Sequence, residues 1–243
     1  QLQEVYGLSA DRRHKMYEWC CQPDSKLTSC FLGGGNEGFR FGLPEYDCSV
    51  MATAIMLIQM ICRDLQTDPN LVIWLWVALP CTCWTTWQFA NMAQSPETRN
   101  KILKDRRMSL QMIRVVKFLV DEIERLCLPV HVCYEWPKNS MGWNIPEMEP
   151  LIQKIPYTMI LDGCMYGVIS ASDRRLSVKK PWRIQTTCLL LSQVTALNQL
   201  CDGRHRHAQC RGAAATLSGR YPVMFARTFT KHMLPNRFPR WER

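Results

Sequence analysis

Residues 71–91, LVIWLWVALPCTCWTTWQFAN, decide the fold that this chain is expected to adopt. The first nine residues are almost continuously apolar, which is typical of a strand buried on both faces of a parallel sheet. The strand should end at Pro80-Cys81, where the chain turns polar and aromatic. A cysteine at that point is a nucleophile, a metal ligand or a small buried residue, and its surroundings must decide between these roles.

Strand-like and helix-like segments alternate on both sides of this stretch. Strands are predicted at 15–21, 39–43, 130–136 and 157–163, an antiparallel edge strand at 180–187, and helices at 49–65, 96–126, 146–154 and 188–200. Ser49 or Asp47 is the expected cap of the first helix. The alternation predicts an α/β fold with a mostly parallel sheet and helices on both faces. We expect one domain over residues 1–195 and a small, irregular, basic C-terminal extension over residues 196–243.

Composition limits the partners that this chain is expected to have. The 243 residues carry a net charge of +9, which favours nucleic acid as a partner, although a merely soluble basic protein remains the alternative. Several of the 13 cysteines lie in apolar runs, which indicates a reducing, intracellular location in nucleus or cytoplasm. No apolar run is long enough to span a bilayer, so no membrane association is expected. Because the chain begins at Gln1, we expect it to be either a shortened chain or a piece of a longer polyprotein.

Polar residues follow three of the predicted buried strands. Pro80-Cys81, Glu135 and Asp162 should therefore converge on the edge where parallel strands end and where such folds bind ligands. A thiolate there can add to carbon 6 of a cytosine ring and make carbon 5 nucleophilic. A carboxyl group near ring nitrogen 3 can assist that addition by donating a proton.

At these residues the sequence resembles the carbon-5 cytosine methyltransferases. The segment PCTCWT at 80–85 is similar to their nucleophile motif, and Glu135-Trp136-Pro137 is similar to their Glu-Asn-Val motif. A third block, with Tyr166-Gly167-Val168 followed by Arg174 and Arg175, also has a counterpart in that family. The resemblance spans residues 71–185, and it extends to methyltransferase-like domains of retroelement or viral polyproteins.

The resemblance implies a Rossmann-like, S-adenosylmethionine-dependent enzyme. Cys81 would be its nucleophile and Glu135 its acid, with Arg174 and Arg175 in the catalytic block. The donor would bind after the first two strands and beside the nucleophile, at Cys21, Pro23, Asp24, Ser25, Asp47 and Pro80. The family's glycine-rich donor loop is replaced here by CCQPDS at 20–25. Asp24 and Ser25 have turn formation as their alternative role, and Asp47 has helix capping.

Other roles stay open for the two central residues. Cys81 is otherwise a small buried hydrophobe, and Glu135 a carboxylate paired with a basic side chain. If Cys81 is the nucleophile, nearby Arg or Lys side chains should lower its pKa, and Cys83, with similar expected exposure, is its control. An amino-group methyltransferase of adenine or cytosine is the competing enzyme class, although Leu79 stands where that class has a polar acceptor. A catalytically inactive nucleic-acid-binding module is the third possibility.

A second cluster of potential ligands lies near the carboxyl end, in CDGRHRHAQC at 201–210. Two thiols and two imidazoles, those of Cys201, His205, His207 and Cys210, suit tetrahedral zinc, whereas a solvated basic loop is the alternative. Basic residues in this half of the chain predict a nucleic-acid-binding face, with DNA favoured over RNA, at Lys179, Lys180, Arg183, Arg204 and Arg206.

Overall fold

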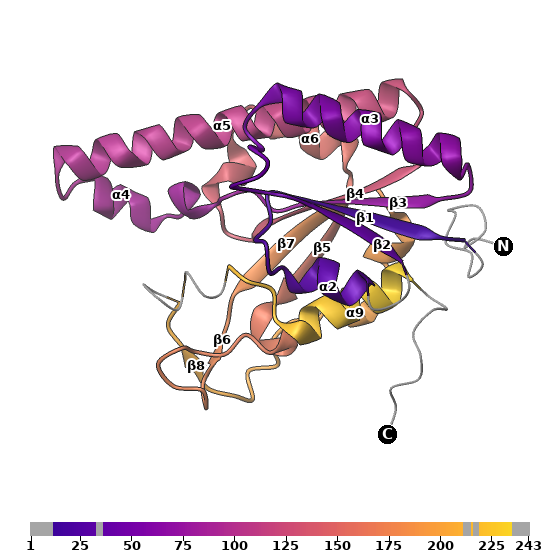
Figure 1. Cartoon of the computed structure of the whole chain (residues 1–243). Coiled ribbons are helices and arrows are strands. Elements are labelled where there is room, and N and C mark those ends of the chain that lie inside the picture. Colours follow the sequence, from indigo (N-terminus) through magenta and orange to yellow (C-terminus); the bar gives the residue numbers. More distant parts are fainter. Residues whose placement is uncertain (1–11, 33–35, 211–214, 216–218, 235–243) are drawn as a thin grey trace.

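The computed structural model describes residues 12–32, 36–210, 215 and 219–234 (Figure 1). A six-stranded sheet with the order β2-β1-β3-β4-β7-β5 forms its centre. The six strands are, along the chain, β1 (His14–Trp19), β2 (Glu37–Phe41), β3 (Val72–Val77), β4 (Val130–Pro137), β5 (Tyr157–Asp162) and β7 (Pro181–Thr186).

The sheet is mostly parallel, as the sequence predicts. β1, β2, β3 and β4 pair in parallel, while β7 runs antiparallel between β4 and β5. The expected edge position of residues 180–187 was therefore wrong. Trp182 and Ile184 on one face of β7 and Gln185 on the other are all buried, and a strand covered on both faces is suited to the interior of a sheet.

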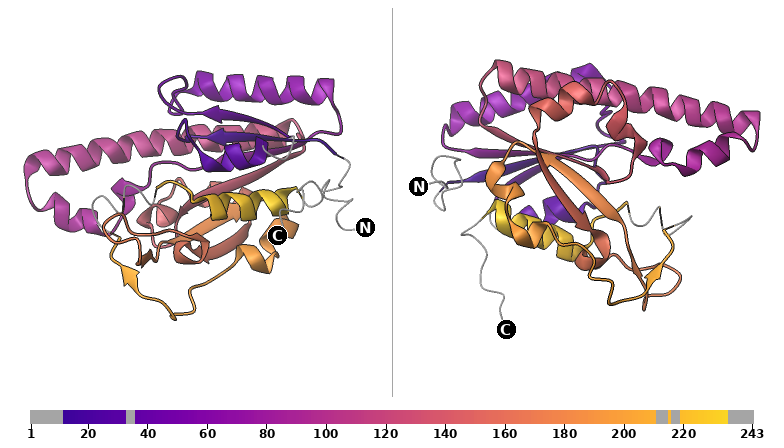
Figure 2. Two further views of the ribbon diagram at one scale, coloured as in Figure 1. Left: turned by 60° about the horizontal axis from the view of Figure 1, so that its bottom comes forward. Right: turned by 180° about the vertical axis from the view of Figure 1, so that it is seen from behind.

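Helices cover both faces of the sheet, which confirms the predicted layering (Figure 2). One layer consists of α3 (Met51–Thr67), α5 (Pro96–Arg125) and α6 (Glu149–Lys154), and the other of α2 (Lys26–Leu32), α7 (Leu189–Ser192) and α9 (Val223–Met233). The short α4 (Trp87–Met92) packs against α5. Among the helices of the described ranges, none has both the length and the apolar character needed to cross a membrane.

The side chains of β3 explain how one strand serves two cores. All six residues of β3 are buried. Leu75 and Val77 point into the apolar cluster beneath α3 and α5, whereas Trp74 and Trp76 point into the cluster with α2 and α9. Because side chains alternate between the two faces of a strand, a strand covered on both faces needs apolar residues at every position.

The two long helices begin differently from one another. Ser95 caps α5 as expected for a serine before a proline, since its Oγ accepts a hydrogen bond from Thr98 N at 3.1 Å. α3 has Val50 as its N-cap, without a side-chain hydrogen bond. Asp47 instead accepts hydrogen bonds from Ser49 N at 2.8 Å and from Ser49 Oγ at 2.6 Å. Asp47 and Ser49 therefore order the turn before α3 rather than cap the helix.

The C-terminal part of the chain is more regular than expected. Residues 188–200 form two short helices, α7 and η4 (Thr195–Leu197), instead of one. Farther on, α9 buries Phe225, Phe229 and Met233 against α2 and the sheet. The spacing of these apolar residues is helical, so the prediction of an irregular tail was wrong for this segment. α2 was also missed, because its seven residues lie within a stretch rich in turn formers.

Candidate active site

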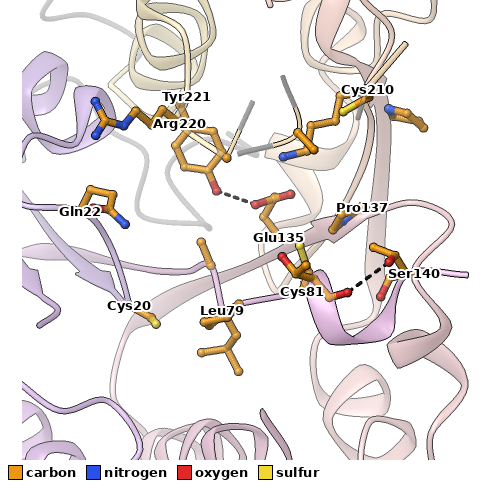
Figure 3. A pocket seen from close by; sticks show the side chains of 18 of the residues that line it. Cys20, Gln22, Leu79, Cys81, Glu135, Pro137, Ser140, Cys210, Arg220 and Tyr221 are labelled. Atoms are coloured by element: carbon orange, nitrogen blue, oxygen red, sulfur yellow. Dashed lines mark hydrogen bonds between the residues drawn. The ribbon is translucent and has the colours of Figure 1, made fainter. Parts of the chain in front are cut away.

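The chain reverses its direction of travel across the sheet between β1 and β3. From β1 it moves outward to β2, then returns to β3 on the other side and continues to β4. Such a reversal leaves a crevice beyond the carboxyl ends of the two strands, where α/β folds bind ligands. A pocket of about 1080 Å³ occupies this position, lined by residues at the ends of β1, β3 and β4 (Figure 3).

Cys81 and Glu135 line this pocket together (Figure 3). Cys81 follows Pro80 after β3, at the start of the 3₁₀ turn η1 (Thr82–Trp84), and Glu135 lies near the end of β4. Because β3 and β4 are parallel neighbours, their carboxyl ends meet at the same edge. The predicted convergence of these two residues is therefore confirmed.

The Glu135 carboxyl group is buried and held in place by the C-terminal segment. Its side chain accepts a hydrogen bond from the Tyr221 hydroxyl, with 2.7 Å between Oη and Oε2. The same hydroxyl accepts a hydrogen bond from Trp76 Nε1 at 3.0 Å. Burial raises the pKa of Glu135, and the charge of Lys180 and the Tyr221 hydrogen bond oppose that rise. A carboxyl group with a raised pKa can donate a proton nearer to neutral pH, which is what a general acid requires.

The Cys81 thiol is not activated in the way the sequence analysis expected. Burial is the main cause that raises its pKa to about 11, the negative charge of Glu135 adds to the rise, and Lys180 opposes it. The expectation that basic side chains leave Cys81 with a lowered pKa was therefore wrong, although Lys180 does act in that direction. Cys83 is also a weaker control than expected, because it is buried whereas Cys81 is partly exposed.

We expect Glu135→Gln to lower the pKa of Cys81 and Lys180→Met to raise it. Removing the carboxylate charge favours the thiolate, and removing the ammonium charge favours the thiol. The pH dependence of iodoacetamide labelling at Cys81, followed by peptide mass spectrometry, measures both shifts. Labelling of the exposed Cys127 in the same sample controls for the reagent. An unchanged pKa of Cys81 in both variants would contradict the electrostatic coupling of these three groups.

The other half of the pocket is built by the turn between β1 and α2. Glu18, at the end of β1, is buried and accepts hydrogen bonds from Ser25 Oγ at 2.7 Å, from Thr28 N at 3.2 Å and from Thr28 Oγ1. Burial raises the pKa of Glu18, and the hydrogen bonds from Thr28 and Ser25 oppose that rise. Cys20 has a φ of 64°, in the left-handed region that glycine usually occupies. Cys20 therefore gives this turn a backbone conformation that usually requires glycine.

The structure brings most of the predicted donor-binding residues to the pocket. Those that line it are Cys21, Asp24, Ser25 and Pro80. Pro23 lies in the same turn, but it is not a lining residue. Asp47 lies between β2 and α3, outside the lining, and its carboxylate is engaged by Ser49. Ordering of the turn before α3, rather than donor contact, is therefore the role that the geometry of Asp47 supports.

Basic side chains surround the mouth of the pocket, namely Lys26, Lys179, Lys180 and Arg220. Arg220 forms an ion pair with Asp24 at 3.4 Å, which joins the C-terminal segment to the turn after β1. Of the predicted nucleic-acid-binding residues, Lys179 and Lys180 therefore lie at the pocket. Arg183 does not, because its guanidinium group lies 4.4 Å from the ring centroid of Trp143 within the layer below α5, where burial lowers its pKa.

The other arginines singled out from the sequence lie outside the pocket lining and are exposed, namely Arg174, Arg175, Arg204 and Arg206. Arg175 pairs with Asp173 at 3.2 Å within its own turn. The structure therefore does not bring Arg174 or Arg175 to Cys81 and Glu135. The expected catalytic role of Arg174 and Arg175 therefore has no geometric support.

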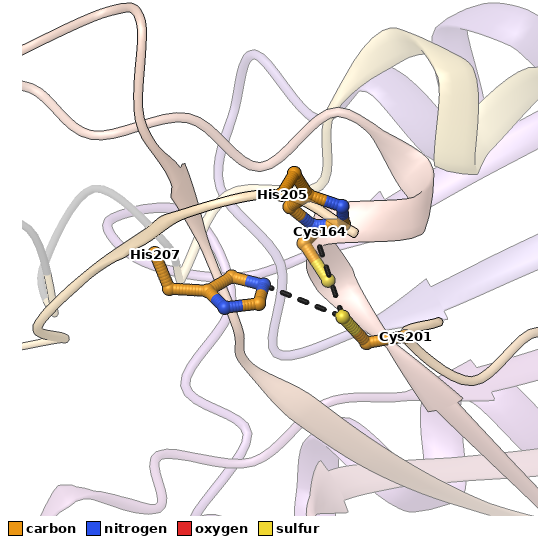
Figure 4. Close-up of side chains that lie close together, drawn as sticks. All are labelled: Cys164, Cys201, His205 and His207. Carbon is orange, nitrogen blue, oxygen red and sulfur yellow. Dashed lines mark hydrogen bonds between the residues drawn. The ribbon is translucent and has the colours of Figure 1, made fainter. Parts of the chain in front are cut away.

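A cluster of sulfur and nitrogen ligands lies beside the end of β5 (Figure 4). Its members are Cys164, Cys201, His205 and His207, whose ligand atoms all lie within 4.8 Å of one another. Such a cluster could hold a metal ion. Cys210, the expected fourth ligand, is not a member and lines the active-site pocket instead. Cys164, in the turn η3 (Gly163–Tyr166) after β5, takes its place.

Neither family models, curated proteins nor solved structures match this chain. The function must therefore be inferred from the pocket itself.

The sequence analysis missed two residues of this pocket, Glu18 and Tyr221. Glu18 could have been found from the sequence, because it is a carboxylate two residues before the predicted donor loop. No local pattern in the sequence indicates Tyr221, because its hydrogen-bond partner Glu135 lies 86 positions earlier in the chain.

Proposed function

We propose that this chain is a nucleic acid methyltransferase that transfers a methyl group from S-adenosylmethionine to carbon 5 of cytosine, with DNA favoured over RNA. One observation carries the proposal, the presence of Cys81 and Glu135 in the same pocket at the point where the chain reverses across the sheet. A thiol and a buried carboxyl group are the nucleophile and the acid that this reaction needs. The resemblance of residues 80–85 to the family's nucleophile motif supports the same assignment.

In the proposed reaction, the Cys81 thiolate bonds to carbon 6 of the ring while Glu135 gives its proton to ring nitrogen 3. Carbon 5 then becomes nucleophilic and takes the methyl group from the sulfonium sulfur of the donor, which leaves as S-adenosylhomocysteine. Loss of the carbon-5 proton to water expels the Cys81 thiolate, and ring nitrogen 3 returns its proton to Glu135, which restores the ring. Because the pKa of Cys81 is raised to about 11, the thiol must give up its proton to water as the reaction begins. The charge of Lys180, which lowers that pKa, stabilises the thiolate that results.

The half of the pocket beneath the β1 turn suits the donor. Glu18 is rigidly held there, and Asp24 and Ser25 supply polar atoms at the wall. The left-handed Cys20 gives a close bend in place of the family's glycine-rich loop. A pocket of about 1080 Å³ is large enough for a nucleoside donor and a target base together. The donor would supply an electrophilic methyl group, while the residues named here would bind and orient it.

Nucleic acid is the partner that the mouth of the pocket favours. Trp87 is 59% exposed and lines the pocket, and an exposed indole ring is a surface on which a base can stack. Lys179, Lys180 and Arg220 place positive charge where phosphate groups would approach. The net charge of +9 supports the same partner. A target base has to leave its stack to reach Cys81, which is the general requirement for enzymes that modify a base.

The amino-group methyltransferase alternative has less support from the geometry. Its acceptor position corresponds to Leu79, whose apolar side chain cannot accept a hydrogen bond from an exocyclic amino group. The Leu79 carbonyl oxygen already accepts a hydrogen bond from Trp136 Nε1 at 2.8 Å. Methylation found at an amino group instead of carbon 5 would nevertheless replace the carbon-5 proposal.

Calorimetric titration with S-adenosylmethionine tests the donor half of the proposal. We expect Gln22→Trp, which places a bulky ring at an exposed position of the lining, to weaken binding at least about tenfold, equivalent to about 1.4 kcal/mol. Asp47→Asn is the matched control and should leave the affinity within about twofold, a change of less than about 0.5 kcal/mol. No detectable binding at millimolar donor would favour an inactive nucleic-acid-binding module instead.

A further inference from the structure

The Cys164–His207 cluster joins two segments that are distant in the sequence. Cys164 belongs to the turn after β5, whereas Cys201, His205 and His207 belong to the loop that follows η4. Cys201 Sγ lies 3.8 Å from His205 Nε2 and 3.5 Å from His207 Nε2. Zinc bonds of about 2.3 Å to sulfur and 2.0–2.1 Å to nitrogen place tetrahedral S and N ligands about 3.6 Å apart. These two sulfur–nitrogen separations therefore match those around a single ion.

Groups around the cluster orient its ligands as in metal sites. The Nδ1 atom of His205, on the ring edge away from the cluster, lies 3.7 Å from a carboxylate oxygen of Asp202. A carboxylate on the outer nitrogen of a ligating histidine fixes its tautomer and orientation. Gly203 N donates a hydrogen bond to Cys201 Sγ at 3.4 Å. Gly203 has a φ of 75°, so this turn uses a glycine to direct its backbone N–H at the sulfur.

We propose that Cys164, Cys201, His205 and His207 bind one zinc ion as a closed, structural site. Two thiolates and two imidazoles are the donor set that zinc takes in tetrahedral sites, and harder cations such as Mg²⁺ and Ca²⁺ prefer oxygen. With four protein ligands, no coordination position is left for a substrate or a reactive water. The site is therefore structural, and it is independent of the methyl-transfer proposal.

The zinc ion would fix one wall of the active-site pocket. Cys201 N donates a hydrogen bond to Asp162 Oδ2 at 2.8 Å, and the same carboxylate oxygen lies 3.6 Å from Lys179 Nζ. The two-stranded sheet of β6 (Ser177–Val178) and β8 (His207–Ala208) pairs a ligand-bearing segment with the residues that directly precede Lys179. Cross-linking these segments by metal therefore holds Lys179 and Lys180 at the pocket.

Metal analysis of cysteine variants distinguishes this ligand set from the one predicted from the sequence, which has Cys210 in place of Cys164. Protein purified without a histidine tag should contain about one zinc per chain, as expected for a four-ligand site. Cys164→Ser should weaken zinc binding at least about tenfold, equivalent to about 1.4 kcal/mol, as measured by competition with a chromophoric chelator. Cys210→Ser, the matched control from the neighbouring loop, should retain about one zinc per chain, because Cys210 lies outside the cluster. The reverse pattern would overturn the proposed ligand set.

Cobalt substitution tests the site without any variant. After chelation of the native metal, Co²⁺ added to the full chain should give intense tetrahedral ligand-field bands and a thiolate-to-cobalt charge-transfer band. Zinc should displace the cobalt and abolish both spectra, since zinc binds N and S ligands more tightly than cobalt does. A spectrum typical of six oxygen ligands, or a folded protein that takes up neither metal, would overturn the proposal.

Discussion

Cys81→Ser should reduce methyl transfer to cytosine at least about 10⁴-fold, on the scale seen when a catalytic nucleophile is removed. A hydroxyl group is a far weaker nucleophile than a thiolate, so a serine at this position should add to the ring much more slowly. The loss should appear in kcat, measured as transfer of labelled methyl groups from S-adenosylmethionine to a cytosine-containing oligonucleotide. Donor affinity should change little, because the donor half of the pocket is built by β1 and the turn that follows it.

Cys83→Ser is the control for that experiment. Cys83 lies two residues farther on, but it is buried in η1 against α5 and is not a lining residue of the pocket. We expect this variant to keep most of its activity per folded molecule, even where burial of a hydroxyl lowers its stability. Full activity of Cys81→Ser would show instead that the Cys81 thiol is structural, and the amino-group methyltransferase would then be the better assignment.

Glu135→Gln should lower kcat about 10²-fold or more, the usual loss for a positioned acid. Glutamine keeps an oxygen that accepts the Tyr221 hydrogen bond, so the pocket should keep its shape. It cannot transfer a proton to the ring, however. Because the thiolate fraction of Cys81 still grows over this interval, the wild-type rate should level off as pH rises through the raised pKa of Glu135, whereas the residual rate of Glu135→Gln should continue to rise. An unchanged kcat in this variant would exclude Glu135 as the acid.

The same raised pKa makes a prediction for stability, with a definite sign. A glutamate in the unfolded chain ionises at about pH 4.3. Glu135 in the folded protein ionises at higher pH because it is buried. The folded state therefore binds more protons between these two values, and the free energy of unfolding falls as pH rises through that interval. Urea unfolding should show that Glu135→Gln is destabilised less by this rise in pH than the wild type. Parallel pH dependences would contradict the raised pKa.

The parts of the fold that follow from local patterns could be predicted from the sequence. The run at 71–79 predicts a buried strand, and the parallel rule then places Cys81 and Glu135 at one edge without any knowledge of their distance. The amphipathic pattern from residue 96 onward predicts α5, which begins at Pro96. In each case a local feature of the sequence, either apolar continuity or amphipathic periodicity, is enough to predict the element.

The parts that depend on tertiary contacts could not be predicted in this way. Insertion of β7 between β4 and β5 is a matter of sheet topology, which the alternation within residues 181–186 does not specify. The presence of Cys164 rather than Cys210 in the cluster with Cys201, His205 and His207 reflects the approach of two distant turns, although Cys210 is closer to these residues in the sequence. The raised pKa of Cys81 results from burial by the assembled pocket, which outweighs the nearby lysine that the sequence does reveal.

A covalent trap tests the central claim most directly. An oligonucleotide with 5-fluorocytosine at the target base is incubated with the protein and S-adenosylmethionine, and the mixture is resolved under denaturing conditions and mapped by mass spectrometry. Because fluorine at carbon 5 cannot leave as a proton does, the enzyme should remain bonded to carbon 6. We predict one adduct per chain at Cys81, present in Cys83→Ser and absent in Cys81→Ser. A donor-bound protein that forms no adduct, or forms one at another cysteine, would contradict the assignment of Cys81 as the nucleophile.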